Sequence, residues 1–145
     1  MKLGIASDHR GYKLKEFLKN NLEYEIIDYG TNSEESTDYP DYAYRLSKAV
    51  VNKEVDFGIA ICGSGIGISI ACNKVRGIRC ARVIDIDDVI ATRSDNDANI
   101  IALSEKIDSN YAIELVKTFV TTNPSMEEKH VRRRNKLTEI ENNER

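Results

Sequence analysis

The strongest constraint on the fold is an alternation of short β-branched runs with segments of helical periodicity along most of the chain. The runs typical of strands are residues 2–7, 25–29, 56–61, 79–84 and 99–104. Each run is followed by apolar positions at helical spacing, as in the series Leu14, Phe17, Leu18 and Leu22. Strands that alternate with helices form a parallel sheet covered on both faces. The sequence therefore predicts an α/β domain with residues 56–61 as its central strand.

Size and charge restrict the class of protein further. The 145 residues suit a single domain, residues 1–145, that is large enough to bury a core. The formal net charge of −3 does not favour a nucleic-acid partner. No apolar run has the length of a membrane span, and the first residues lack a signal-peptide pattern. We therefore expect a cytoplasmic protein that binds neither nucleic acid nor membrane.

Three loops are candidates for a binding site: residues 8–11, 62–67 and 95–99. Ligands of parallel α/β sheets bind beyond the carboxyl ends of the strands. The loop Cys62-Gly63-Ser64-Gly65-Ile66-Gly67 is the richest in glycine. Ile68 stands where a dinucleotide fingerprint would have its last glycine, and also where a Cys-x5-Arg phosphatase loop would have its arginine. Because no Gly-Lys-Ser/Thr occurs either, the loop is not a nucleotide P-loop.

The glycine loop and its cysteine can support two kinds of chemistry. Gly63, Gly65 and Gly67 let backbone amides approach an anion, and the helix that follows favours a thiolate at Cys62. A thiolate is either a nucleophile or a base that removes a proton next to a carbonyl, while the amides stabilise the oxygen that becomes negative. Ser64 is placed to move protons between substrate oxygens. The alternative is structural: Cys62 is a small residue at a strand end, the glycines form a tight turn and Ser64 caps the helix.

Metal and redox chemistry are not expected from this composition. The chain has two histidines, so an ordinary zinc site would need unusual ligands. The three cysteines form no Cys-x-x-Cys pair, and Cys72 and Cys80 lie in an apolar helix and a strand, as expected of core residues.

At this point the chain resembles a known family, the type B ribose-5-phosphate isomerases and the related galactose-6-phosphate isomerase subunits. The matching segments occur in the family's order and spacing along almost the whole chain. They are Ser7-Asp8-His9-Arg10-Gly11, Tyr29-Gly30-Thr31, Asp38-Tyr39-Pro40, residues 61–69 with the glycine loop, Asn73-Lys74, Gly77-Ile78-Arg79 and Asn96-Asp97-Ala98-Asn99.

The resemblance implies a fold, an assembly and a reaction. The fold is a three-layer α/β/α sandwich with a five-stranded parallel, Rossmann-like sheet. The protein is expected to be a homodimer or tetramer whose active sites are shared between subunits, with a C-terminal helix of about residues 125–142 packing on a partner. The reaction is proton transfer between C1 and C2 of a sugar phosphate through an enediolate. It uses neither a metal nor any other cofactor.

The resemblance also suggests roles for individual residues. Cys62 corresponds to the carbon base, and the amides from Gly63 to Gly67, Ile66 included, correspond to the enediolate cradle. Asp8 and His9 correspond to ligands of the substrate's hydroxyls and phosphate, and Tyr42 to a residue lining the pocket. Each of the last three has a structural alternative: a helix cap for Asp8, an ordinary surface histidine for His9 and core packing for Tyr42.

Three positions depart from the family pattern. Asp95 replaces a histidine that is proposed to open the sugar ring, and it precedes Asn96, a candidate substrate ligand. Asp95 can act as an acid only if burial favours its protonated form, and otherwise it is a turn former. Lysines replace arginines at Lys106 and Lys129. Lys129 and Arg133 share a helical face that either binds a partner's phosphate or is simply solvated, and Lys106 has the same two interpretations.

These observations predict an isomerase of ribose 5-phosphate and ribulose 5-phosphate. Two alternatives stay open because Asp95 departs from the family. The first is an isomerase of a hexose 6-phosphate, such as allose or galactose 6-phosphate. The second is a non-catalytic sugar-phosphate-binding subunit that needs a paralogous partner.

Overall fold

The computed structural model describes residues 1–144, and Arg145, the last residue of the predicted domain, lies outside the described residues. The strands are β1 (Lys2–Ser7), β2 (Glu25–Asp28), β3 (Phe57–Cys62), β4 (Cys80–Arg82) and β5 (Ile100–Ser104). The helices are α1 (Tyr12–Asn21), α2 (Tyr39–Val51), α3 (Ile66–Asn73), α4 (Ile86–Ser94), α5 (Ser109–Thr121) and α6 (Glu128–Glu144).

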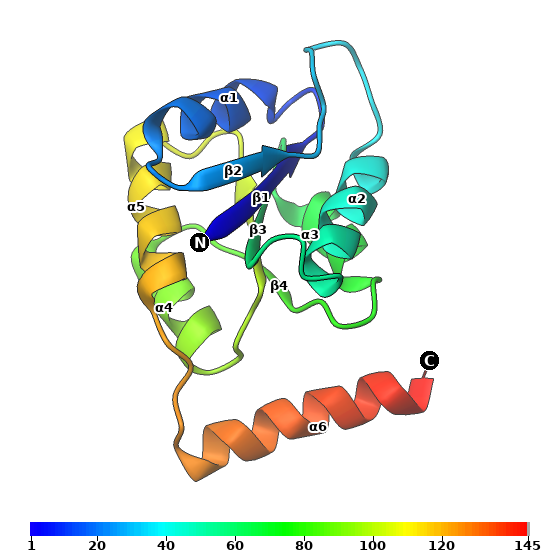
Figure 1. Cartoon of the computed structure of the whole chain (residues 1–145), viewed down its shortest axis with the longest axis vertical. Coiled ribbons are helices and arrows are strands. Elements are labelled where there is room, and N and C mark those ends of the chain that lie inside the picture. Colours follow the sequence, from blue (N-terminus) through cyan, green and yellow to red (C-terminus); the bar gives the residue numbers. More distant parts are fainter. Residues whose placement is uncertain (145) are drawn as a thin grey trace.

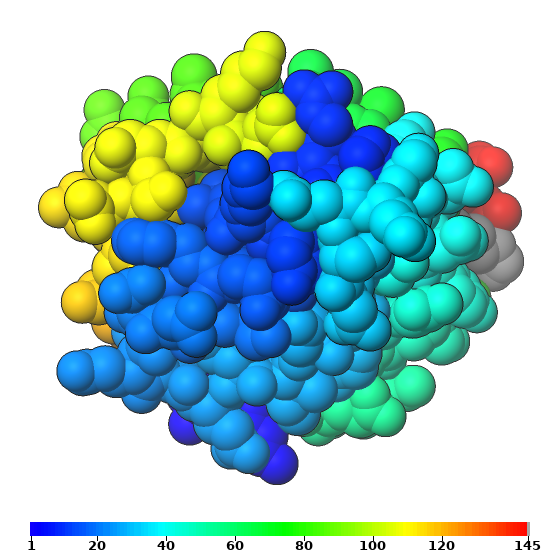
Figure 2. All heavy atoms as spheres, turned by 90° about the horizontal axis from the view of Figure 1, so that it is seen from above, coloured from blue at the N-terminus to red at the C-terminus, as the bar shows by residue number. Residues whose placement is uncertain are grey.

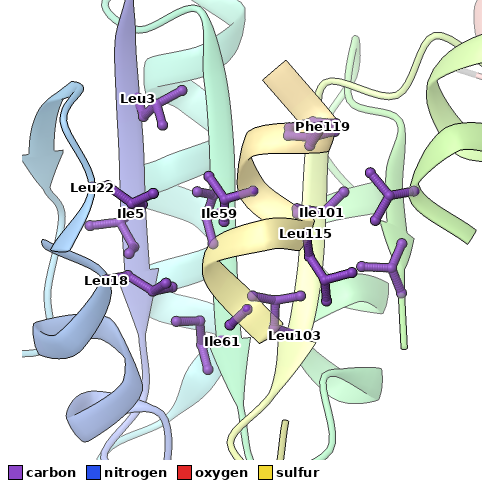
Figure 3. Close-up of a cluster of buried hydrophobic side chains, with 14 of the residues drawn as sticks. Leu3, Ile5, Leu18, Leu22, Ile59, Ile61, Ile101, Leu103, Leu115 and Phe119 are labelled. Carbon is purple, nitrogen blue, oxygen red and sulfur yellow. The ribbon is translucent and has the colours of Figure 1, made fainter. Parts of the chain in front are cut away.

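All pairings in the sheet are parallel, in the order β2-β1-β3-β5-β4. The hydrophobic strand β3 is central, which confirms the prediction. Its register aligns Ile59 with Ile5 on one side and with Ile101 on the other. All three isoleucines are fully buried, and Figure 3 shows them side by side, with Ile5 near Leu18 and Leu22 and Ile101 near Leu115. The β-branched runs therefore form the sheet side of the hydrophobic core.

Helices cover both faces of the sheet, so the three-layer α/β/α architecture is confirmed (Figure 1). On one face α1, α4 and α5 pack around a cluster that includes Leu18, Val89 and Phe119. On the other face α2 and α3 pack around Leu46 and Ile68. Helix α2 begins at Tyr39 with a proline in its first turn, where the missing amide hydrogen of proline has no acceptor to lose.

Helix α6 leaves the layers and crosses the amino end of the sheet (Figure 1). It contacts the segment before β4, where Arg79 donates to Oγ1 of Thr138 at 2.9 Å and to the carbonyl of Arg134 at 3.3 Å. The helix begins at Glu128, not at about residue 125 as predicted. The amide of Ser125 is bound to the carbonyl of Ser94 instead, which holds this residue in the connection.

A buried lysine joins α1 to the sheet, and the sequence pattern did not reveal it. The side chain of Lys15 is fully buried, with Nζ 2.6 Å from Oδ2 of Asp28 and 2.9 Å from Oε2 of Glu16. Lys19 also contacts both carboxylates. Burial opposes the charged form of Asp28, but the hydrogen bonds from the two lysines outweigh it and lower the pKa of this carboxyl. The polar cluster thus satisfies a cation that would be costly to bury alone.

Candidate active site

An open pocket of about 490 Å³ lies at the carboxyl ends of β1, β3 and β5. It is lined by Asp8, His9, Arg10, Tyr39, Cys62, Gly63, Ser64, Gly67 and Lys106. Figure 2 looks onto this end of the molecule, where the loop after β1 (blue), the loop before α2 (cyan) and the loop after β5 (yellow) meet. Two of the three predicted loops, residues 8–11 and 62–67, therefore come together as expected for a parallel sheet.

Cys62 is the last residue of β3, and its side chain is almost completely buried. Its sulfur accepts a hydrogen bond from the amide of Gly65 at 3.2 Å. Gly65 has a left-handed φ of 76°, and a Cβ on it would lie 2.9 Å from the carbonyl carbon of Leu103. Only glycine accommodates both the positive φ and the lack of space for a Cβ. The loop therefore forms the predicted tight turn, and this turn directs the amide of Gly65 at the thiol.

Three hydrogen bonds from β4, β5 and the residue after β5 hold the glycine loop. Oγ of Ser104 donates to the carbonyl of Gly63 at 2.7 Å, and Nε of Arg82 donates to the carbonyl of Ser64 at 3.2 Å. The amide of Glu105 donates to the carbonyl of Cys62 at 3.0 Å. With its carbonyls bound in this way, the loop keeps a fixed shape next to the pocket.

Ser64 combines the two interpretations given to it. Its Oγ accepts from the amide of Ile66 at 3.1 Å, as a residue at a helix start does, and the same side chain lines the pocket. Gly67 lies in the first turn of α3, whose amides have no acceptor within the helix. A Cβ at Gly67 would lie 2.8 Å from Cζ of Tyr39, so this glycine makes room for the tyrosine.

Asp8 and His9 are anchored through one atom each. Oδ1 of Asp8 accepts from the amides of Arg10 at 3.0 Å and Gly11 at 3.1 Å, which closes the turn before α1. Oδ2 of Asp8 accepts no hydrogen bond from residues 1–144. Nδ1 of His9 accepts from the amide of Thr37 at 3.2 Å, which assigns the proton of the neutral ring to Nε2. Each side chain therefore has one polar atom engaged and a second one that makes no hydrogen bond within residues 1–144.

Arg10, which lines the pocket, forms a bidentate ion pair with Glu105, and sequence reasoning missed this pair. Nε of Arg10 lies 3.2 and 3.1 Å from the two carboxylate oxygens, and NH2 lies 2.9 Å from Oε1. The hydrogen bond and the charge of Arg10 lower the pKa of the Glu105 carboxyl. The pair ties the loop after β1 to the loop after β5.

The structure supports the packing interpretation of Tyr42. Its ring lies against Gly30, where an added Cβ would be 2.7 Å from Cε1, and the guanidinium of Arg45 stacks 5.0 Å from the ring centroid. The aromatic residue that lines the pocket is Tyr39, which sequence reasoning did not select. The position of Tyr39 next to Pro40 could have indicated this role. Proline marks the start of a helix, and a helix that follows β2 starts at the carboxyl end of the sheet.

The third predicted loop lies at the opposite end of the molecule, so its placement beside the other two was wrong. Residues 95–99 lead into β5, whereas the glycine loop follows β3, and the register pairs Gly58 with Ile100 and Cys62 with Ser104. The four steps from Ile100 to Ser104 alone separate the two ends by about 13 Å. A loop that enters a parallel strand lies at its amino end, and this is the physical reason for the difference.

The remaining predicted residues gather at that amino end. Oδ1 of Asp95 lies 3.6 Å from Nε2 of His130, and the Asp95 side chain is 49% exposed. Asn96 lines a cavity of about 300 Å³ between β4 and α6, and its carbonyl accepts from Arg79 at 3.2 Å. Lys129 and Arg133 are exposed on α6. Within one chain, none of these four residues meets Cys62.

Two classes of feature are absent from the part of the chain that the structure describes. In residues 1–144 no three His, Cys, Asp or Glu side chains are grouped so that they could hold a metal ion. Over the same range, every helix is too short or too polar to cross a membrane.

The fold and the pocket define an α/β domain with a thiol and an amide-rich loop at the carboxyl edge of its sheet. The model of the ribose/galactose isomerase family matches residues 3–137, and the chain belongs to this family. It is therefore an isomerase, and the resemblance inferred from its motifs is confirmed.

Relatives of known structure and sequence agree with this assignment. Ribose-5-phosphate isomerase B of Escherichia coli is 42% identical over 122 residues, covering 82% of this chain and 80% of the relative. The structure of Clostridium thermocellum ribose-5-phosphate isomerase B superposes with a TM-score of 0.93 at 44% identity, covering both chains completely. Ribose-5-phosphate isomerase B from Mycoplasma genitalium with bound ribulose-5-phosphate gives a TM-score of 0.89 at 33% identity, covering 97% of this chain and 96% of that one.

Proposed function

We propose that the protein interconverts ribose 5-phosphate and ribulose 5-phosphate by proton transfer between C1 and C2. The observation that carries this proposal is the Cys62 sulfur held against the amide of Gly65, beside the free atoms of Asp8 and His9. The named activity of the Escherichia coli relative and the ligand bound to the Mycoplasma genitalium protein support the choice of a pentose phosphate.

In the proposed mechanism the Cys62 thiolate removes the C2 proton of the open-chain aldose and returns it to C1. The electron pair of the broken C–H bond forms the enediolate, and negative charge develops on the carbonyl oxygen at C1. Amides at the start of α3, such as that of Gly67, stabilise this oxygen, because they have no acceptor within the helix. The Ser64 hydroxyl transfers the proton between O2 and O1, which completes the balance.

Asp8 and His9 have complementary roles in this scheme. Oδ2 of Asp8 accepts from a substrate hydroxyl, and Nε2–H of His9 donates to a substrate oxygen. Lys106 adds a positive charge at the same rim and binds the phosphate. No ring-opening residue is assigned in this half of the site, and the half-exposed Asp95, which follows α4, is assigned as a turn former.

A second copy of the chain is proposed to supply the other half of the site. Lys129, Arg133 and Asn96 lie beyond the amino end of the sheet and can meet Cys62 only from another subunit. Large exposed apolar side chains are available for such a contact, including Ile70 on α3, which is 55% exposed, and Ile140 on α6, which is 61% exposed. Packing of α6 on a partner, in a homodimer or tetramer, would cover the second of these.

One experiment separates the candidate functions. The purified protein is incubated in D₂O with ribose 5-phosphate, allose 6-phosphate and galactose 6-phosphate, and exchange of the C2 proton is followed by NMR. The proposal predicts exchange and turnover fastest with the pentose. Preference for a six-carbon sugar would overturn the substrate, and no exchange with any sugar would leave a non-catalytic binding subunit.

A further inference from the structure

Three basic side chains are shared between the pocket of Cys62 and a neighbouring pocket of about 430 Å³. They are His9, Arg10 and Lys106, and they lie at the boundary between the two hollows. Among the described residues that line the Cys62 pocket, Arg10 is the one guanidinium. It has no role in the function proposed above.

The guanidinium of Arg10 is held in place by protein contacts on one side. Its Nε and NH2 are bound to Glu105, while NH1 donates no hydrogen bond to any of residues 1–144. The side chain is 54% exposed, so the unbound edge is open to solvent. Glu105 therefore fixes the plane of the guanidinium without using all of its donors.

The unbound edge lies next to the glycine loop. A Cβ at Gly63 would stand 3.3 Å from Cζ and 3.6 Å from NH1 of Arg10, so the guanidinium packs directly on the residue that follows Cys62. Arg10 and Cys62 line the same pocket. Lys106 offers a phosphate a single mobile charge, whereas an oriented arginine offers a planar set of donors.

We propose that Arg10, oriented by Glu105, binds the substrate's phosphate and sets the specificity of the pocket for phosphorylated sugars. Arg10 is then a binding residue and Glu105 a positioning residue. The inference rests on the proposed function in assuming that the substrate is a sugar phosphate. Arg10 then provides the planar set of hydrogen-bond donors for the phosphate that Lys106 cannot provide.

The test compares Arg10→Ala, Arg10→Lys and Glu105→Gln with the wild type in the full-length protein. Loss of a charged hydrogen bond to phosphate is expected to raise KM for ribose 5-phosphate about 10- to 100-fold in Arg10→Ala, with kcat nearly unchanged. Arg10→Lys keeps the positive charge but loses the planar set of donors, so its KM is expected to lie between those of the wild type and Arg10→Ala. Glu105→Gln should raise KM less than Arg10→Ala does. In the double variant that combines Arg10→Ala with Glu105→Gln, KM should be close to that of Arg10→Ala alone.

Binding of inorganic phosphate, measured by titration calorimetry, keeps this inference separate from the function. The dissociation constant of phosphate should rise in the same order as KM, even if the protein turns over no sugar tested. Lys13→Ala is the matched control: it removes a positive charge three residues away, where Lys13 is paired with Glu34 at 3.5 Å.

Four results would overturn the inference. These are a fall in kcat at constant KM, unchanged constants in Arg10→Ala, an equal effect of Lys13→Ala, and no phosphate binding by the wild type. Circular dichroism of each variant verifies folding. If Arg10→Ala does not fold, Arg10→Lys and Glu105→Gln are used instead. KM and the phosphate dissociation constant should then be raised in both variants, and unchanged values in both would overturn the inference.

Discussion

The amide of Gly65 donates a hydrogen bond to the sulfur of Cys62, and it does so from a left-handed backbone conformation that a side chain would disturb. The thiol and the turn are therefore one unit: the residue that shapes the loop is also the residue that solvates the sulfur.

Gly65→Ala should destabilise the protein and reduce its activity together. The positive φ and the close approach to the Leu103 backbone cost about 1–3 kcal/mol in the free energy of unfolding. Urea denaturation measures the first effect and isomerase assays the second. Gly63→Ala is the matched control for stability, because the nearest atoms to its Cβ would be side-chain atoms of Arg10, at 3.3 Å or more, and its φ is not in the left-handed region. Equal losses in the two variants would contradict the special role of Gly65.

Cys62→Ala should lower kcat for ribose 5-phosphate by about 10²–10⁴-fold, the usual range for loss of a general base, while KM changes little. Proton exchange at C2 should fall by the same factor. Cys80→Ala provides the control thiol, since this cysteine lies in β4 away from the pocket and should keep its activity. Full activity of the Cys62 variant would remove this residue from the role of base.

Asp28→Asn should destabilise the protein at neutral pH by about 2–3 kcal/mol, because the buried Lys15 loses its closest partner. The folded pKa of Asp28 is lowered, so its contribution is present above its unfolded pKa and is lost as the pH falls through the folded value. The difference between wild type and variant should therefore shrink below about pH 4. Urea titrations at pH 7 and pH 3 measure it, and a difference independent of pH would contradict the assignment.

Mixing two inactive variants tests the shared site. Cys62→Ala and Arg133→Ala should each be impaired, and hybrids formed by refolding them together should contain one intact site per dimer. Random pairing of equal amounts then restores roughly a quarter of wild-type activity. Each variant refolded alone is the control. A mixture that stays as inactive as its components would argue that Arg133 and Cys62 do not meet across subunits.

The fold was predictable because local periodicity determines it. The buried runs ending at Ser7, Cys62 and Ser104 became the three central strands, and alternation with helices required a parallel sheet. The observed ends of some helices and strands differ from the predicted ones by a few residues, where other groups bind the backbone. At α6, for example, Ser125 is bound to the end of α4 instead of starting the helix.

The site was predictable only as far as short-range motifs reach. The turn at Gly65 follows from the loop sequence, but the pair of Arg10 and Glu105 joins residues that are 95 positions apart, and no local pattern indicates it. Tyr39 and Tyr42 differ by one helical turn, so only the direction of α2 decides which of them lines the pocket. The misplaced loop at Asp95 shows that a motif's neighbours in sequence need not be its neighbours in space.

The order of the strands has a consequence for how the protein avoids unwanted polymers. The two strands at the borders of the sheet are the shortest, with four residues in β2 and three in β4. So short a border offers few unpaired amides and carbonyls as a template for another strand. Helix α6 also covers the segment that leads into β4, with its contacts on Arg79 and Gly77. Copies of this chain are therefore guided to associate through helices and side chains, and extension of the sheet into an aggregate is disfavoured.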